Sequence, residues 1–172
     1  MGIYFENVYT DSEEMFREIT SKIGMKRSKH WIWVYLALAV YYAVFLLPDG
    51  SILSWLFFLL CIGYIAWILI LPIYRSKTFI KKSKEYYNGT IPQTIVQFRD
   101  EAVTVTHGDS VGTVPYDKIS KVFFLNHSIV LQAGKMATVV LSTSGFTKGT
   151  LKEFQSFIAQ KCPKIKVPDW QW

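Results

Sequence analysis

A long apolar stretch from Trp31 to Tyr74 restricts what this chain can fold into more than any other feature. Its one charged side chain, Asp49, lies in the short segment 48–51 that contains Pro48 and Gly50. At about 1.5 Å rise per residue, helices over 31–47 and 52–73 would extend roughly 26 Å and 33 Å, close to the roughly 30 Å hydrocarbon thickness of a bilayer. The sequence therefore predicts a transmembrane hairpin with two spans.

The alternative is a soluble protein that buries two apolar helices in its core. Neither run shows an amphipathic stripe, which a soluble helix normally has. Neither run contains an Asp, Glu, Lys, Arg or His residue, and ion or proton pathways need such groups. The pattern therefore favours a membrane anchor over a soluble core and over a subunit of an oligomeric transporter.

Basic residues on both sides of the hairpin predict its orientation. Cationic loops stay cytoplasmic, so both termini are expected in the cytoplasm and the turn at Asp49 outside. Contact with anionic lipids also explains the net charge of +6 without nucleic acid binding. The residues expected at the membrane surface are Lys26, Arg27, Lys29, Arg75, Lys77, Lys81, Lys82 and Lys84. The expected aromatic anchors at the two interfaces are Trp31, Trp33, Trp55 and Tyr74.

The two cysteines indicate a reducing environment for the soluble part. Cys61 lies inside the second run and Cys162 near the C-terminal end, so no disulfide framework is expected. The polar residues before Trp31 and the lack of a cleavage pattern after the first run argue against a cleavable signal peptide. The first span is therefore expected to serve as an uncleaved anchor.

A strand and an amphipathic helix are predicted before the hairpin. Residues Ile3–Val8 are aromatic and β-branched, and Thr10 or Asp11 can cap a helix whose apolar residues recur every four positions from Met15 to Ile23. Such a helix suits the inner membrane surface or the face of a soluble domain. A solvated linker with little helix is the alternative.

The residues after the hairpin change from a helical to a strand period. A basic helix is expected to continue out of the membrane, and from 94 to 141 short alternating runs separated by Gly, Asp and Asn predict six antiparallel strands. Thr147 or Thr150 can cap a final helix. Its apolar stripe comprises Leu151, Phe154, Phe157 and Ile158. The predicted division is 1–30 (N-terminal strand and amphipathic helix), 31–74 (hairpin), 75–91 (basic juxtamembrane helix) and 92–172 (cytoplasmic domain).

A bent antiparallel sheet closed by a C-terminal helix resembles a pleckstrin-homology-like domain. With two spans before it, the whole chain resembles the YcxB-like family of small bacterial membrane proteins. The residues that carry this resemblance are Phe98, Asp100, Glu101, Tyr116, Ile119 and Phe146. It implies an α+β membrane protein of the bacterial inner membrane, in which a two-helix hairpin precedes a pleckstrin-homology-like domain. It implies no catalytic residues.

No catalytic or metal-binding pattern stands out. His107, Asp109 and Ser110 share one tight turn, where their side chains cannot face one another as a nucleophile, base and acid must. The three histidines and two cysteines lack metal-ligand spacing, and the glycines punctuate turns rather than form a phosphate loop. We therefore expect no enzyme, cofactor or metal.

Binding is the function that remains. The acidic pair Asp100-Glu101 argues against specific phosphoinositide recognition, whereas addition of a peptide strand to a sheet edge suits this fold. The aromatic ending 168–172 is expected to pack on the domain or membrane, or to dock a partner. The sequence thus favours a scaffold that engages a protein partner, or another copy, at the inner membrane surface. The alternative is an immunity protein that protects its producer from a secreted toxin.

Overall fold

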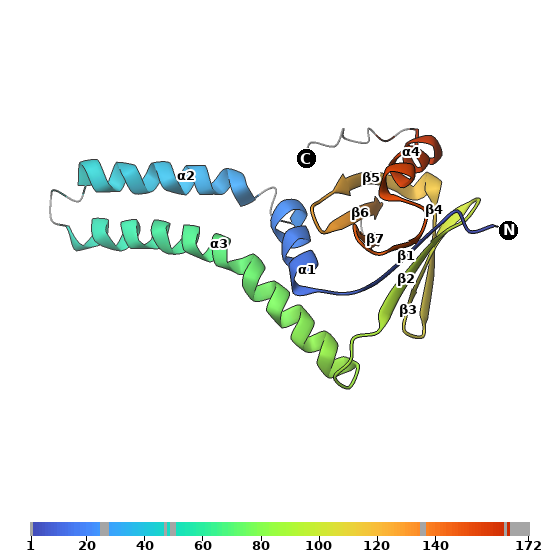
Figure 1. Ribbon diagram of the computed structural model, residues 1–172. Coiled ribbons are helices and arrows are strands. Elements are labelled where there is room, and N and C mark those ends of the chain that lie inside the picture. Colours follow the sequence, from blue (N-terminus) through green and yellow to red (C-terminus); the bar gives the residue numbers. More distant parts are fainter. Residues whose placement is uncertain are drawn as a thin grey trace.

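The computed structural model describes residues 2–24, 28–46, 48, 51–134, 137–163 and 165. Within these residues the chain is an α+β protein with two parts. A helical arm projects from a domain of antiparallel sheets, and the two parts meet near the N-terminal helix (Figure 1). The predicted combination of a helix-rich part and antiparallel sheets is confirmed.

The arm is built from two long helices that lie side by side (Figure 1). The helices are α2 (Ser28–Tyr41), continued by the π-helical segment η2 (Tyr42–Leu46), and α3 (Ile52–Tyr86). Among the described residues, α3 is the one helix long and apolar enough to cross a membrane, by length and composition, and His30–Phe45 is a shorter apolar helix. The expected outer turn lies mostly outside the described residues, including Asp49.

Helix α3 continues well beyond the apolar stretch and bends on the way (Figure 1). Pro72 lies inside it, has no N–H for the carbonyl of Ile68, and crowds that carbonyl with its ring, which is a common cause of helix bending. The helix ends where Asn88 and Gly89 take φ values of 52° and 98°. The Gly89 N–H donates to the Lys84 carbonyl at 2.7 Å, which satisfies one of the last carbonyls.

Helix α1 precedes the arm. It spans Glu13–Ile19 and continues as the π-helical turn η1 (Thr20–Gly24). Its N-cap is Ser12, whose Oγ accepts the Met15 N–H at 3.2 Å. The predicted caps Thr10 and Asp11 were therefore wrong. Both lie too early, because the preceding strand extends to Thr10.

Within the described residues, eight strands form two sheets. The first sheet has the order β4-β3-β2-β1-β8 and the second β5-β6-β7. The strands are β1 (Phe5–Thr10), β2 (Gln93–Phe98), β3 (Ala102–His107), β4 (Ser110–Pro115), β5 (Ile119–Phe124), β6 (Ser128–Ala133), β7 (Ala137–Ser142) and β8 (Phe146–Lys148). The 3₁₀ turn η4 (Tyr116–Lys118) joins β4 to β5. The six strands predicted after Pro92 are confirmed as β2–β7.

Strand β1 lies inside the first sheet, although the helical arm separates it from the other strands in sequence. It pairs antiparallel with β2, with Thr10 opposite Gln93 and Phe5 opposite Phe98, and its other edge pairs with β8. Sequence analysis grouped this strand with an N-terminal segment, because strand patterns carry no information about their partners. The arm is thus an insertion between two neighbouring strands of one sheet.

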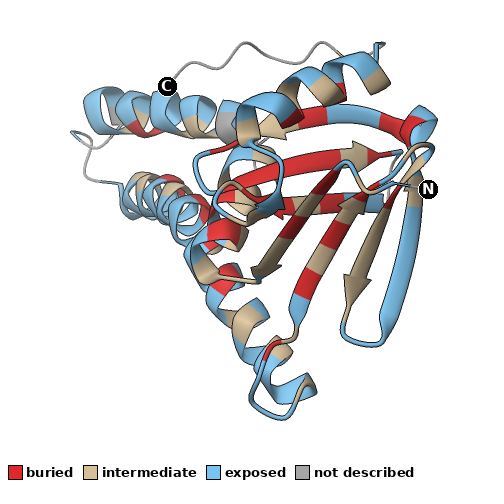
Figure 2. Ribbon diagram, turned by 45° about the vertical axis from the view of Figure 1, so that its right-hand side comes forward, coloured by how far each residue is buried: buried red, intermediate tan, exposed pale blue. Residues whose placement is uncertain are grey.

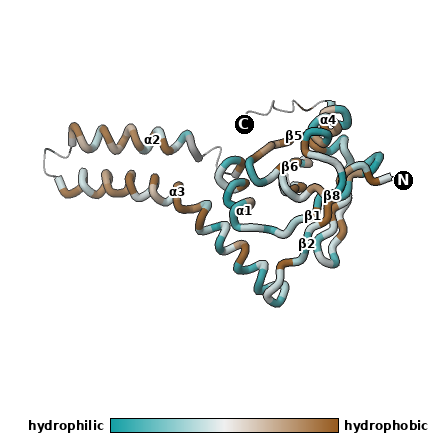
Figure 3. Tube along the Cα trace, viewed as in Figure 1, coloured by the Kyte–Doolittle hydropathy of each residue, from teal (hydrophilic) through white to brown (hydrophobic). Residues whose placement is uncertain are grey.

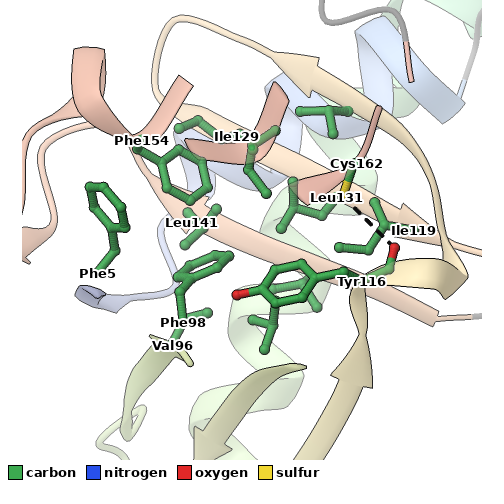
Figure 4. Close-up of a cluster of buried hydrophobic side chains, with 14 residues drawn as sticks. Phe5, Val96, Phe98, Tyr116, Ile119, Ile129, Leu131, Leu141, Phe154 and Cys162 are labelled. Atoms are coloured by element: carbon green, nitrogen blue, oxygen red, sulfur yellow. Dashed lines mark hydrogen bonds between the residues drawn. The ribbon is translucent and has the colours of Figure 1, made fainter. Parts of the chain in front are cut away.

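Helix α4 (Leu151–Lys161) packs on the sheets and completes the core (Figure 4). Thr150 caps it in a capping box with Glu153, as one of the two predicted caps. Phe154 is fully buried and contacts Phe98 edge to face, with ring centroids 4.8 Å apart. Phe5 of β1 contacts the same ring at 5.6 Å. The core therefore needs residues from both sides of the arm.

Asn7 of β1 joins the two sheets. It is fully buried, and its Nδ2 donates to the Ser142 carbonyl at 2.8 Å while its Oδ1 accepts the Ser142 N–H at 3.0 Å. The Asn7 side chain thus pairs with the backbone of Ser142 at the end of β7, as a neighbouring strand would. Gly149 lies beside the same strand, next to Phe5. Its φ is +80°, and a Cβ at this position would clash with the Phe5 ring.

Candidate functional site

Glu18 fastens α1 to the second sheet. Its carboxylate accepts the backbone N–H groups of Asn126 and His127 at 2.8 and 2.9 Å, in the turn between β5 and β6. Lys22, one turn further along, lies 3.5 Å from the same carboxylate, whose side chain is 8% exposed. Backbone N–H groups and a cation are suitable partners for a buried carboxylate. We call this contact the Glu18 clasp.

The opposite side of α1 contacts the arm. The rings of Phe16 in α1 and Phe79 in α3 stack with centroids 4.1 Å apart and planes 4° apart. Helix α1 therefore lies between α3 and the second sheet (Figures 1 and 2). The first four residues of β6, Ser128–Leu131, are all buried, because β6 is the central strand of its sheet and is covered on both faces. Of the two placements predicted for this helix, the structure has the one against the domain.

A cavity of about 470 Å³ remains where α1, α3 and the second sheet meet. It lies on the face of the sheet that points away from α4, since Val130 lines it while Ile129 and Leu131 belong to the core. The described residues that line it are Phe16, Ile19, Thr20, Ile23, Tyr74, Arg75, Thr78, Phe123, Val130, Gln132 and Thr138. We call this the basal cavity.

The walls of the basal cavity are mostly apolar, with polar groups in a minority. Of the described residues that line it, Arg75 is the one with a charge, and none is a carboxylate. Arg75 is exposed and has no ion pair or hydrogen bond within the described part of the chain. The cavity is therefore suited to an apolar group that carries negative charge at one end.

The basic residues predicted at the membrane surface fall into two groups. Lys26 and Arg27 lie outside the described residues, and so does the side chain of Lys29. The others occupy α3 after the apolar run, where Lys81 forms an exposed ion pair of 3.9 Å with Glu85. The exposed basic residues of this part of α3 are Arg75, Lys77, Lys81, Lys82 and Lys84.

The four predicted aromatic anchors are all exposed on the arm. Trp31 and Trp33 lie in α2 at its end near α1, and Trp55 lies in the first turn of α3 at the far end of the arm. Tyr74 lines the basal cavity. The residues along the arm are predominantly hydrophobic (Figure 3), and many of the large ones are exposed.

A polar cluster lies at the other end of α3, where the arm rejoins the first sheet. His107 Nδ1 and Thr94 Oγ1 are 2.7 Å apart, and the Tyr87 ring contacts the imidazole at 5.4 Å. Burial raises the pKa of Asp11, and the charge of His107 opposes that shift. Burial likewise raises the pKa of Tyr9. The hydroxyl that His107 contacts is therefore that of Thr94, and these contacts hold the ends of β2, β3 and α3 together.

The turn between β2 and β3 is fastened to the end of α4. Lys161 Nζ donates to the Asp100 carbonyl at 2.8 Å and lies 5.7 Å from the ring centroids of Tyr4 and Tyr116. Tyr116 Oη donates to the Arg99 carbonyl at 2.8 Å, and burial raises its pKa. The acidic turn noted in the sequence therefore helps to hold the end of α4 against the first sheet. Within the described residues no group of three His, Cys, Asp or Glu side chains is placed to hold a metal.

No family model, curated protein or solved structure matched the chain. The site therefore has to be interpreted from its own residues. The structural role of Glu18 was not predicted. Its partners are backbone groups, so in the sequence it resembles an ordinary helix surface residue. It also missed the basal cavity, although the stripe of Met15, Ile19 and Ile23 was its one visible signal.

Proposed function

We propose that the protein is a membrane-anchored, non-catalytic binding module of a bacterial inner membrane. In this proposal α2 and α3 cross the bilayer as a hairpin, and the sheets form a pleckstrin-homology-like domain on the cytoplasmic side. The domain binds a protein partner or another copy of the chain and holds it close to the membrane surface.

The pairing of β1 with β2 is the observation that carries this proposal. Strand β1 precedes the arm and β2 follows it, and the two are neighbours along their whole length from Phe5–Phe98 to Thr10–Gln93. Two paired strands must lie on the same side of a membrane. The chain between them therefore crosses an even number of times. Because α3 has the length and composition to cross, α2 is the partner that returns the chain.

The exposed surface of the arm supports the same conclusion. Large apolar side chains cover it, including Trp33, Ile52 and Leu59 with exposed fractions of 71%, 80% and 62%. Such side chains need an apolar environment that the described chain does not supply. The 18-residue apolar window of α3 is only 17% buried, which is low for a helix in a soluble core.

The charges at the base of the arm support the cytoplasmic placement. Arg75 is the first charged residue after the apolar run of α3, and further lysines follow on the same helix. These lysines lie at the same end of the arm as the sheets (Figure 1). Cationic segments beside a span stay cytoplasmic.

The strand order supports the pleckstrin-homology-like assignment. Strands β1–β4 are neighbours in order, the three-strand meander β5–β7 follows, and the short strand β8, which pairs with β1, leads into a C-terminal helix. The arm replaces the turn between the first two strands. The domain is thus attached through both ends of the arm, and the Glu18 clasp and the Phe16–Phe79 stack restrict its tilt. This attachment suits a module that keeps a bound partner at a fixed distance from the bilayer.

Strand β4 offers the most open surface for a partner. It is an edge strand, its first four residues are exposed, and it carries no charged side chain. Charges and bulges normally protect such edges from pairing. Pro115 interrupts the edge only at its end. Addition of an extended segment to this edge is therefore the binding mode that we propose.

Cysteine labelling of intact cells tests the membrane arrangement. We expect Ser51→Cys to react with a membrane-impermeant maleimide from outside, and Lys82→Cys to react only after lysis. The unsubstituted chain, with Cys61 and Cys162 both buried, gives the background. Extraction of the protein by alkaline carbonate, or equal labelling of both positions in intact cells, would contradict the proposal.

Affinity purification tests the binding surface. The tagged full-length chain is purified from its native membranes in mild detergent, together with Val111→Lys, which places a charge on the β4 edge. Gln160→Lys, on the exposed face of α4, is the matched control. A partner, or a second copy, that is retained by the control and lost by Val111→Lys supports binding at β4. Equal recovery from both variants would exclude that edge.

A further inference from the structure

The basal cavity lies where the membrane-facing and the soluble parts of the chain meet. We propose that it holds one acyl chain of an anionic membrane phospholipid, with the lipid phosphate bound to Arg75. This inference rests on the proposed membrane insertion of the arm. It adds a ligand site that the scaffold function does not require.

The position of Arg75 relative to the bilayer is the first argument. The run 52–74 of α3 contains no charged residue, so Arg75 is the first side chain that must reach the head groups. Tyr74 beside it has the amphipathic ring typical of the interface. Both residues line the basal cavity. The cavity therefore begins at the depth where lipid phosphates lie.

The walls of the cavity match the chemistry of such a lipid. Phe16, Ile19, Ile23, Phe123 and Val130 provide an apolar surface for a hydrocarbon chain. The volume of about 470 Å³ lies within the roughly 300–1,000 Å³ that is typical of small-molecule sites. An apolar cavity of this kind is poorly suited to water, which needs several polar partners. The acyl chains of the adjacent leaflet are the nearest source of an apolar ligand of this size.

The polar groups of the cavity match the other end of the lipid. The guanidinium of Arg75 has no partner within the described chain, and its planar set of N–H donors fits two phosphate oxygens. Thr20 and Thr78 add hydroxyl donors for ester or phosphate oxygens. No carboxylate among the described lining residues opposes the negative charge. A zwitterionic lipid would bring a cation toward Arg75 and is therefore expected to bind less well.

Photocrosslinking of the full-length chain tests this inference. The chain is reconstituted in phosphatidylcholine nanodiscs that contain a trace of phosphatidylglycerol with a photoactivatable acyl chain, and crosslinked peptides are mapped by mass spectrometry. We expect crosslinks on the cavity walls in α1 and in β5–β7, beyond the apolar run. Photoactivatable phosphatidylcholine, used in parallel, is expected to crosslink the apolar run only.

Two variants and one control locate the ligand. Arg75→Gln removes the phosphate contact and is expected to lower crosslinking of the walls about tenfold or more, because hydrogen bonds to charged groups contribute about 1.5–3 kcal/mol. Thr138→Trp places a large ring in the cavity from an exposed position of β7 and is expected to abolish these crosslinks. Lys82→Gln removes a charge from the same helix outside the cavity and is expected to change nothing. Unchanged thermal unfolding shows that each variant is folded.

Three results obtained with an inserted chain would overturn the inference. Crosslinks confined to the apolar run would mean that the cavity holds no lipid chain. Equal loss in Arg75→Gln and Lys82→Gln would mean general attraction to the surface. Equal crosslinking of the walls by both lipids would remove the proposed preference for an anionic lipid over a zwitterionic one. A chain that fails to enter the nanodisc overturns the proposed function as well, whereas an inserted chain with uncrosslinked walls overturns the lipid site alone.

Discussion

The sheet domain and the helical arm are both rich in apolar residues, but they place them in opposite ways. In the sheet domain the large apolar side chains point inward, and Phe98 of β2 and Phe154 of α4 are completely buried (Figure 4). In the arm the large side chains point outward, and exposed residues dominate α2 and the first part of α3 (Figure 2). Apolar composition alone therefore does not define a core. The period of the apolar residues indicates where their side chains are directed. Strand-like alternation in the sheets marks a core inside the chain, whereas the continuous apolar runs of the arm mark a surface that faces outward.

The largest contrast is expected between Phe5→Ala and Ile52→Ala. Phe5 is 8% exposed in the core, whereas Ile52 is 80% exposed on the arm. Truncation of a buried Phe costs about 3–5 kcal/mol, and exposed substitutions usually stay within about 0.5 kcal/mol. Hydrogen exchange of the β2 amides in the detergent-solubilised full-length chain measures the difference. Equal protection of β2 in both variants would mean that β1 is dispensable and that the domain is complete without it.

Glycine substitutions sharpen the contrast within the sheet domain. Gly149→Ala forces a left-handed backbone on a residue with a Cβ and places that atom against the Phe5 ring, so we expect a loss of about 2–4 kcal/mol. Gly112→Ala, in the exposed strand β4, meets nothing within 4 Å and is the matched control. Chemical denaturation followed by circular dichroism measures both. Similar midpoints for the two variants would show that Phe5 does not fill the space beside Gly149.

The Glu18 clasp joins the two parts, and its removal is expected to loosen their connection without unfolding either. Glu18→Ala removes the acceptor of the N–H groups of Asn126 and His127, and because both residues are exposed and can turn to water, we expect a loss of only about 1 kcal/mol. Glu14→Ala changes an exposed glutamate of the same helix. We expect faster hydrogen exchange at Asn126 and His127 in the first variant only. Unchanged exchange there would show that α1 does not depend on this carboxylate.

The smallest expected effect concerns the capping box of α4. Hydrogen bonds from the Thr150 hydroxyl and N–H, both 2.8 Å long, hold the pKa of Glu153 below its usual value of 4.5. Because the folded pKa is lowered, the contribution of this carboxylate is present above pH 4.5 and is lost as the pH falls through the folded pKa. NMR titration of the Glu153 side-chain carboxyl is expected to give a midpoint below 4.5. Thr150→Ala should move that midpoint back up, and an unchanged midpoint would exclude the capping box as its cause.

Much of the fold follows from local patterns that the sequence displays. The alternation of Val96 and Phe98 predicts β2, and Thr150 three residues before Glu153 predicts the start of α4. The pairing of β1 across the arm does not follow, because strand partners far apart in sequence leave no local signal. The Glu18 clasp and the basal cavity depend on the same long-range packing. The exposed apolar surface of the arm was predictable because it comes from composition along a single helix.

The insertion of the arm between β1 and β2 has a consequence for how the protein is made. A ribosome releases β1 first and reaches β2 only after the whole arm, at a rate of about 5–20 residues per second. Until then Phe5 has no core to enter, and β1 has neither of its neighbours in the first sheet, β2 and β8. An arm that crosses the bilayer only once would leave β1 and β2 in different compartments. For an arm that crosses the bilayer twice, as proposed, closure of the sheet would report correct insertion, and a chain without it would leave strand edges unpaired.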